Sequence, residues 1–495
     1  MKAYCLVLAI FAVIYGVSCA PGLLWQDSGL IQYRVLHHDI HGFFGLALAH
    51  PLYYWVAFAA KAVPIGDALF RINLISALAG AITVANIFLL VRLWLGQTGP
   101  AVLAAMSLGL SHTFWRHACI AETYTLWAMF FTCELVLFFL YVKTEKMSFA
   151  YALAGINGLA VSVHMLGCLS AVCYLAYGLT LVRKKRIHPS KIALTMMIWL
   201  VGTLPYSSLI LHEMVKSQDI AGTLVSAAFG DRWLDDVLNA SLSWRVAKEN
   251  MLYIVLNYPT VNIGLVFIGL FGLFRKQMRH VMLVMLVMLG VLAFVFLLFA
   301  WRYTVVDRYA FFIPFYCVMA LFMGKGLHNL SKNGDIKVVS LALAFSLCPV
   351  AVYALIPGTL RAQGYSLGTR QNIPYRDDLT YFLQPWKTGY RGADRFAQEV
   401  LVGLEEHAVL YADHTTVAPL VLYQDSHGIR PDVHVVSSVI HTPGAPEFSK
   451  VSLDQLLTTR PVYVVSDQPG HYPSFLQENY ALRQRGHVFQ VFLPE

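Results

Sequence analysis

The chain has 495 residues, of which 58% are hydrophobic and only 13% are charged, and its mean hydropathy is +0.59. A soluble protein of this length would carry far more charge, so the composition excludes that class and indicates many bilayer-spanning segments. The net charge of +8 does not indicate nucleic-acid binding, because the basic residues form short clusters between apolar runs, as cytoplasmic loops of membrane proteins do.

The first twenty residues combine Lys2, an apolar run and Val-Ser-Cys-Ala, a pattern that resembles a signal peptide. A lipoprotein cleavage box would have a larger apolar residue in place of Gly16, three positions before Cys19, so we expect an uncleaved first span. The eight cysteines of the chain all lie in or beside apolar segments. They predict small buried side chains rather than a disulfide framework or a CxxC metal site.

Apolar stretches continue along most of the chain, and a bilayer core of about 30 Å needs roughly 20 residues for each helical span. Spans are expected near 3–21, 72–94, 99–115, 122–142, 149–164, 166–182, 192–211, 252–274, 281–300, 309–327 and 337–357. The pattern therefore predicts an α-helical polytopic membrane protein with about eleven spans.

The basic clusters between these spans support the count. Strict alternation from a cytoplasmic N-terminus places every cluster in the cytoplasm, as the positive-inside rule requires. The clusters are Lys143 and Lys146; Arg183, Lys184, Lys185 and Arg186; Arg275, Lys276 and Arg279; and Lys325, Lys332 and Lys337. The two spans within 149–182 have no charged break between them, and only Ser162, His164 and Gly167 mark the middle of that stretch.

Three long segments are then expected on the side of the membrane opposite the cytoplasm: loop 22–71, loop 212–251 and everything after about residue 358. The apolar patches of the first loop are too short to span, so we expect helices that lie along the membrane surface. Trp233 and Trp244 in the second loop are expected to anchor it at the interface. We therefore expect residues 1–357 to form a transmembrane domain and residues 358–495 an extracytoplasmic one.

The polar C-terminal part has the alternating pattern of a small α/β domain. Short runs at 408–412, 433–437, 461–466 and 488–493 are typical of strands, and 393–406 and 415–424 are typical of helices. The sequence contains no GxGxxG motif, no P-loop and no internal repeat.

Two acidic residues stand at the expected outer mouth of the bundle. Asp27, in Trp25-Gln26-Asp27-Ser28-Gly29, could act as a base or could simply cap a surface helix. Glu122 begins an apolar span, where a carboxylate is costly and therefore a functional candidate. Its alternative roles are an ion pair with Arg116 or His117, or a charge at a helix N-terminus.

Other polar side chains lie at the same level. His164 interrupts an apolar hairpin, where it is either a packing residue or part of a site. Arg302, Asp307 and Arg308 could hold an anionic group, or the arginines could only anchor helix ends by snorkelling. The histidines at 37, 38, 41 and 50 match no zinc-binding spacing, so we expect no metal and no cofactor.

Several segments together resemble a known family. They are Trp25–Gly29, Arg71–Leu78, Phe114–Leu126, Gly158–His164, and Tyr411-Ala412-Asp413 followed by Tyr423-Gln424 and Gly428–Val433. Their order and spacing resemble the GT-C class of glycosyltransferases, and more narrowly the protein O-mannosyltransferase family that includes the enzyme modifying IPT domains.

The resemblance implies roles for particular residues. Asp27 would be the catalytic acidic residue, and Glu122 and His164 would line the same external cavity. Together with the positions of the polar residues, this leads us to expect that Glu122 and His164 are catalytic along with Asp27. The expected substrate-binding residues are His50, Trp115, Tyr124, Arg302, Asp307 and Arg308. One departure is that family members usually have a His-Pro-Pro-Gly-Tyr-Pro-like turn in the first loop, whereas this chain has Ala-His-Pro-Leu-Tyr-Tyr at 49–54, so the resemblance does not fix its substrate.

The expected function is therefore transfer of a sugar, a hexose such as mannose, from a polyprenyl-phosphate donor to an extracytoplasmic protein or glycan acceptor. The short loops favour a bacterial inner membrane. A transporter or flippase of lipid-linked sugars is the alternative, although its usual inverted repeat is not seen. A non-catalytic scaffold is the third hypothesis, and it predicts that Asp27, Glu122 and His164 lie more than roughly 15 Å apart, far beyond hydrogen-bond reach.

Overall fold

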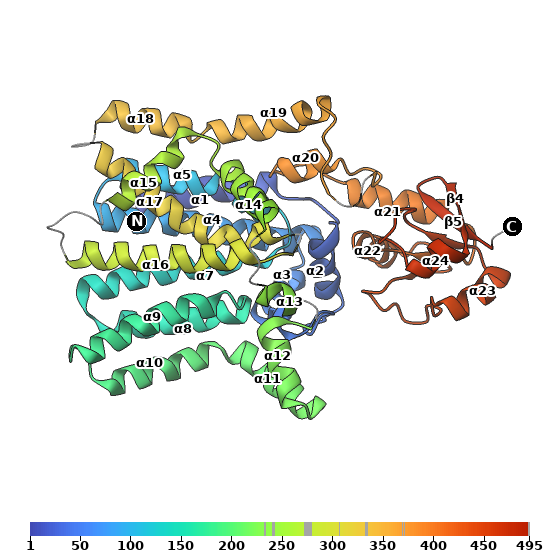
Figure 1. Cartoon of the computed structure of the whole chain (residues 1–495), viewed down its shortest axis with the longest axis horizontal. Helices are drawn as coiled ribbons and strands as arrows, with labels where there is room; N and C mark the ends of the chain where they lie inside the picture. The colour runs from blue at the N-terminus through green and yellow to red at the C-terminus, as the bar shows by residue number, and fades with distance from the viewer. Residues whose placement is uncertain are drawn as a thin grey trace.

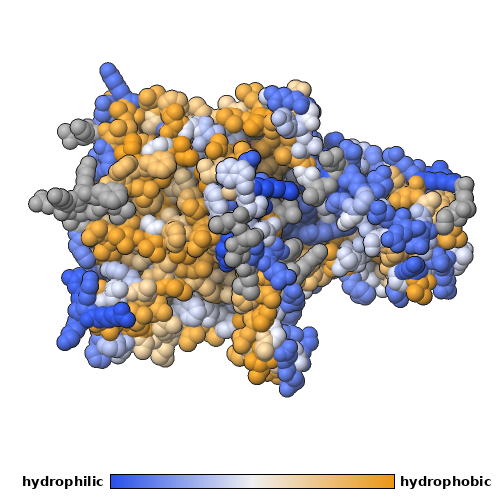
Figure 2. All heavy atoms as spheres, in the orientation of Figure 1, coloured by the Kyte–Doolittle hydropathy of each residue, from blue (hydrophilic) through white to orange (hydrophobic). Residues whose placement is uncertain are grey.

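The computed structural model describes residues 1–231, 234–239, 243–271, 280–305, 307–331, 335–368, 370 and 372–493. Figure 1 shows a bundle of roughly aligned helices, a layer of short helices across one end of it, and a small α/β unit beyond that layer. In Figure 2 apolar residues cover the sides of the bundle, and hydrophilic residues gather on the α/β unit and at the opposite end.

Five helical segments are long and apolar enough to cross a membrane, judged by length and composition within the described residues. They are α4 (Ala68–Leu95), α7 (Thr123–Thr144), α16 (His280–Arg302), η4 with α17 (Arg308–Phe312 and Ile313–Leu330), and α18 with α19 (Ile336–Phe345 and Cys348–Ala362). Shorter apolar helices accompany them: α1 (Lys2–Ser18), α5 (Thr98–Gly109), α8 (Met147–Val163), α9 (Gly167–Arg183) and α12 (Ile220–Phe229). A multispan membrane protein is thus supported, and the figure of about eleven spans stays a prediction.

Two of the predicted spans are broken. The stretch 192–211 is divided between α10 (Pro189–Gly202) and α11 (Leu204–Ser217), which meet at 70°. The stretch 252–274 is divided between α14 (Trp244–Asn257) and the segment formed by η2 (Val261–Ile263) and α15 (Gly264–Leu270), which meet at 107°. Each bend has a proline beside it, Pro205 and Pro259, and proline cannot donate the backbone hydrogen bond that would continue a helix. With these two bent pairs, up to seven spans satisfy the length and composition test.

Some predicted features fall outside the described residues. They are residues 272–274 of one span, the basic residues Arg275, Lys276, Arg279 and Lys332, and the interface residue Trp233. The hairpin within 149–182 is described, and it is divided as predicted: α8 ends at Val163, His164 lies in the turn, and α9 begins at Gly167.

The first loop forms the layer of short helices that was predicted, with α2 (Gln26–Leu36), η1 (Leu46–Leu48) and α3 (Pro51–Ala62), and α6 (His112–Ala118) and α13 (Leu234–Leu238) lie in neighbouring connections. Arg34 holds the loop between α2 and α3 in place. Its guanidinium donates to the carbonyls of Ile40, Leu48 and Ala49 and lies 3.9 Å from the centre of the Tyr54 ring. The loop is therefore compact although most of it lacks regular structure.

The C-terminal part contains a five-stranded sheet of order β2-β1-β3-β5-β4, in which β1 is parallel to β2 and β3, and β5 is antiparallel to β3 and β4. The strands are β1 (Val409–Tyr411), β2 (His434–Val436), β3 (Val462–Val464), β4 (Ala481–Arg485) and β5 (Val488–Phe492). The helices are α20 (Asp378–Leu383), α21 (Gly392–Gly403), α22 (Val417–His427), α23 (Lys450–Thr459) and α24 (Ser474–Asn479). Four strands, α21 and α22 agree with the prediction, whereas β4 was missed because its polar sequence Ala-Leu-Arg-Gln-Arg lies at an exposed edge.

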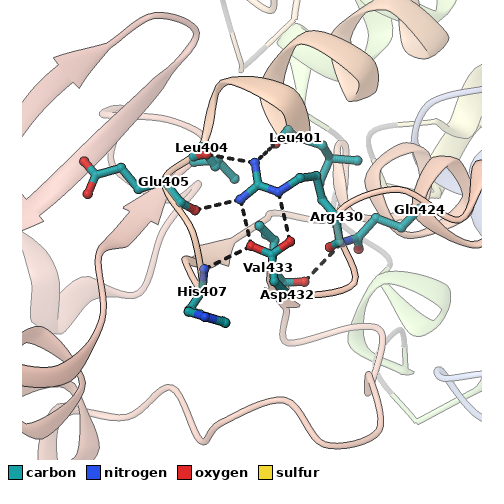
Figure 3. Close-up of polar contacts among 8 residues, drawn as sticks. All are labelled: Leu401, Leu404, Glu405, His407, Gln424, Arg430, Asp432 and Val433. Atoms are coloured by element: carbon teal, nitrogen blue, oxygen red, sulfur yellow. Dashed lines mark hydrogen bonds and ion pairs between the residues drawn. The ribbon is translucent and has the colours of Figure 1, made fainter.

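The segment Gly428–Val433, part of the family resemblance, has a structural role (Figure 3). Arg430 donates both to the carboxylate of Asp432, at 2.9 Å for each bond, and to the carbonyls of Leu401, Leu404 and Glu405. These carbonyls end α21, so the arginine caps that helix and joins it to the start of β2.

The α/β unit is packed onto α2 through a shared hydrophobic core. The Trp25 ring lies 5.2 Å from that of Phe396 on α21, and Trp25 Nε1 donates to the Tyr390 hydroxyl at 2.7 Å. Gly29 is required mainly by the Leu24 carbonyl oxygen, with which a Cβ atom there would clash, and it also leaves room for α22, whose Ala418 Cβ would lie 3.1 Å away. This contact fixes the α/β unit against the layer of short helices.

Candidate active site

A cavity of about 1000 Å³ lies where the bundle end, the first loop and the α/β unit meet. Its lining includes seven of the nine residues proposed from the sequence: Asp27, His50, Glu122, Tyr124, His164, Arg302 and Asp307. Trp115 and Arg308 are not among the lining residues. The Trp115 ring packs 5.5 Å from Trp386, and Arg308 is paired with Glu249 and donates to Asn250.

Asp27 lies in the first turn of α2, after the N-cap residue Trp25. It is therefore not the cap that the alternative interpretation required, although a carboxylate in the first turn still interacts favourably with the helix dipole. Its side chain is 49% exposed, and Oδ1 lies 3.1 Å from Nε2 of His414 in the α/β unit. The carboxylate is thus accessible and has a partner from a distant part of the sequence.

Glu122 is the N-cap residue of α7. Its Oε1 accepts a hydrogen bond from the Ser28 hydroxyl at 3.1 Å, which joins it to the residue next to Asp27. Arg116, considered in the sequence only as an ion-pair partner of Glu122, donates to the Tyr309 hydroxyl at 2.9 Å and lies 5.5 Å from the centre of the Phe382 ring. Arg116 is buried and lines the cavity, so it provides a fixed positive charge there.

Aromatic rings form one wall of the cavity. The His164 ring stacks on His50 at 5.0 Å and lies 5.3 Å from Tyr124. Nδ1 of His164 accepts the backbone N–H of Leu166, so its Nε2 is the ring nitrogen left to donate. His50 Nδ1 donates to the carbonyl of Val163 at 2.8 Å, which attaches the first loop to the end of α8.

Arg302 is the last residue of α16, and Asp307 lies in the connection from α16 to η4. Burial and the charge of the Asp27 carboxylate raise the pKa of Asp307 above its ordinary value. Arg302 donates to the carbonyls of Val237 and Asn239, so part of its donor capacity is already used. At this end of the cavity, the carboxylates of Asp27, Glu122 and Asp307 therefore lie together with the guanidinium groups of Arg116 and Arg302.

The α/β unit contributes residues that were not proposed for the site from the sequence, although Asp413 belongs to a segment of the family resemblance. They follow the carboxyl ends of the parallel strands, where ligands bind in many α/β proteins. Asp413 accepts hydrogen bonds from Arg370 at 2.6 Å, from His471 at 3.0 Å and from the Thr416 hydroxyl at 2.7 Å. Burial alone would raise the pKa of Asp413, but the hydrogen bond from His471 and the charge of Arg370 bring it below its ordinary value.

Among the described residues, no group of three His, Cys, Asp or Glu side chains is arranged to hold a metal ion. Two of the first-loop histidines have other partners, since His37 pairs with Asp425 and His38 lies 2.9 Å from the Lys61 amine.

The fold is similar to that of proteins of known structure. A crystal structure of ArnT from Cupriavidus metallidurans bound to undecaprenyl phosphate matches with a TM-score of 0.62 and 14% identity, covering 99% of each chain. The apo form of the same protein matches with a TM-score of 0.60 and 15% identity, covering 99% of this chain and 98% of that one. This chain has a GT-C fold. No curated protein sequence matches the chain.

Residues 46–188 match the family described as protein O-mannosyl-transferase TMEM260, N-terminal domain. The predicted resemblance to protein O-mannosyltransferases is thereby confirmed. The matched segment contains His50, Glu122, Tyr124 and His164 but not Asp27, which the GT-C fold brings to the same cavity.

Proposed function

We propose that the protein is an integral membrane glycosyltransferase that moves a sugar from a polyprenyl-phosphate donor to an acceptor hydroxyl outside the cytoplasm. A hexose such as mannose and a protein hydroxyl are the substrates that the TMEM260 match favours. The donor class is favoured by the ArnT likeness, since that protein was crystallised with undecaprenyl phosphate. The proposed location is a bacterial inner membrane, with the N-terminus cytoplasmic and the α/β unit periplasmic.

One observation carries the proposal: the Asp27, Glu122 and Asp307 carboxylates share a cavity with the buried Arg116 at the end of an apolar bundle. Both charge types are needed in sugar transfer from a phosphate. A carboxylate takes the proton of the acceptor hydroxyl or orients that hydroxyl. A fixed cation stabilises the negative charge that develops on the departing phosphate.

The cavity lining supports particular residues for these proposed roles. Asp27 is the accessible carboxylate and is proposed to activate or orient the acceptor. Arg116 and Arg302 are proposed to hold the phosphate, because both line the cavity whereas Arg308 does not. The apolar lining residues Leu169 and Phe299 lie on α9 and α16, where the lipid chain of the donor would leave the cavity toward the bilayer.

The test is transfer by the purified protein from a panel of polyprenyl-phosphate hexoses, with the covalent product identified by mass spectrometry. Asp27→Asn should lower turnover by about 10²- to 10⁴-fold. Asp67→Asn is the matched control, because Asp67 lies in the same loop, caps α4 and is not among the cavity-lining residues. Equal turnover by Asp27→Asn would remove Asp27 from the mechanism, and sugar movement across vesicles without a covalent product would favour a transporter.

A further inference from the structure

We propose that His414, supplied by the α/β unit, is the positioning residue for the Asp27 carboxylate, so that this unit completes the catalytic group. The proposal rests on the proposed function, because it concerns the same acceptor-activating carboxylate. It assigns to the C-terminal unit a direct role at the reacting end of the cavity.

The contact itself has the N···O distance of an ion pair. His414 Nε2 lies 3.1 Å from Asp27 Oδ1, and both side chains remain accessible, at 40% and 49%. The His414 ring also meets the edge of Phe44 from the first loop, with centroids 5.9 Å apart and ring planes at 78°. The imidazole is thus oriented by an aromatic neighbour on the same loop that carries His50.

The backbone on both sides of His414 is held. On one side, Asp413 is fixed by Arg370, His471 and Thr416 within the α/β unit. On the other side, the carbonyl of Thr415 accepts the backbone N–H of Gln26, the residue before Asp27, at 3.2 Å. The histidine and the aspartate are therefore placed by a direct link between their neighbouring residues.

The other charged groups in the cavity explain how this contact could help the Asp27 carboxylate. Asp27 faces another carboxylate, Asp307, and Glu122 and Arg116 lie in the same cavity. A protonated imidazole at ion-pair distance from Oδ1 offsets the repulsion among the carboxylates and restricts rotation of the Asp27 side chain. Oδ2 is then the atom presented to the acceptor.

The proton and the bonds balance in the resulting step. The acceptor O–H bond breaks and its proton goes to Oδ2 of Asp27, while the acceptor oxygen forms a bond to the anomeric carbon of the sugar. The bond between that carbon and the phosphate oxygen breaks, and its electron pair leaves with the phosphate. His414 takes no proton in this step and only holds the carboxylate.

The test is a double-mutant cycle on the transfer reaction in the full-length protein. His414→Ala should lower kcat by about 10- to 100-fold, since a displaced catalytic group loses rate of this order, with the KM for the donor nearly unchanged. His414→Gln, which keeps an N–H donor near the Nε2 position, should recover most of that loss. In the Asp27→Asn background, His414→Ala should have no further effect. The matched control is His441→Ala, an exposed histidine of the same unit.

Three results would overturn the proposal while leaving the proposed function intact. They are wild-type turnover by His414→Ala, no recovery by His414→Gln, and a further loss when His414→Ala is added to Asp27→Asn. Size-exclusion profiles of each variant identify misfolding, and the Gln variant provides the comparison where the Ala variant does not fold. Absence of transfer by the wild-type protein would overturn both the proposed function and this inference.

Discussion

Trp25 is the side chain whose removal should most clearly separate the α/β unit from the bundle. It is 2% exposed, packs against Phe396 and donates to the Tyr390 hydroxyl. Truncating a buried tryptophan to alanine costs about 3–5 kcal/mol. Of this, about 1 kcal/mol corresponds to the hydrogen bond. If this free-energy cost weakens the contact between the α/β unit and α2, the ratio of molecules with the unit packed on α2 (docked) to molecules with it detached (undocked) falls by about 10²- to 10⁴-fold.

Hydrogen exchange of the full-length protein in lipid nanodiscs measures this ratio, because undocking exposes the amides of α21 and α22. Trp25→Ala should reduce their protection by several orders of magnitude, whereas Trp25→Phe, which keeps a ring beside Phe396, should reduce it by about tenfold or less. Trp244→Ala is the matched control, since Trp244 is 74% exposed. Wild-type protection in Trp25→Ala would refute the claim that the shared core holds the unit in place.

Three further predictions concern charge and topology. Because the pKa of Asp307 is raised from 3.8 to about 7, the stability it contributes is present in acid and is lost as pH rises between these two values, so Asp307→Asn should flatten the fall in Tm over that range, and parallel curves would contradict this. Asp413→Ala should cost about 3–5 kcal/mol by leaving the 6% exposed Arg370 without its carboxylate, and thermal unfolding of Asp413→Leu combined with Arg370→Met should show a smaller loss. Reporter fusions after Arg186 and after Gly364 should report the cytoplasm and the outside respectively, and a shared side would break the proposed alternation.

Local patterns accounted for much of the fold. The strands at 409–411 and 462–464 were predictable because each is a short apolar run between polar turns, and α22 because its apolar residues recur along Val417–His427. The bends beside Pro205 and Pro259 were missed because hydropathy records how apolar a stretch is and not its direction. The number of membrane crossings depends on that direction.

The candidate site was predictable only where a charge stands at the mouth of an apolar helix. Asp27, Glu122 and Asp307 were selected for that reason, and they do line one cavity. Arg308 was selected on the same grounds, yet its partner is Glu249, 59 positions earlier, and no periodic pattern indicates such a pairing.

Arg116 and His414 were not proposed for the site because contacts between distant parts of the sequence bring them there. Arg116 was considered only beside Glu122, because its aromatic neighbours Tyr309 and Phe382 come from distant segments. His414 follows a predicted strand, but its contact with Asp27 arises only when the α/β unit packs onto α2.

The shared core between α2 and the α/β unit has a consequence for biosynthesis. Trp25 and its partner Tyr390 are 365 positions apart, so at ribosomal rates the tryptophan is made about 20 to 70 s before the residue that covers it. During that interval the apolar face of α2 is uncovered at the bilayer surface, and the Asp27 carboxylate has no histidine beside it. A chain stopped before the last helices would leave the proposed pair of Asp27 and His414 unassembled, so such incomplete products of translation should lack the proposed transfer activity.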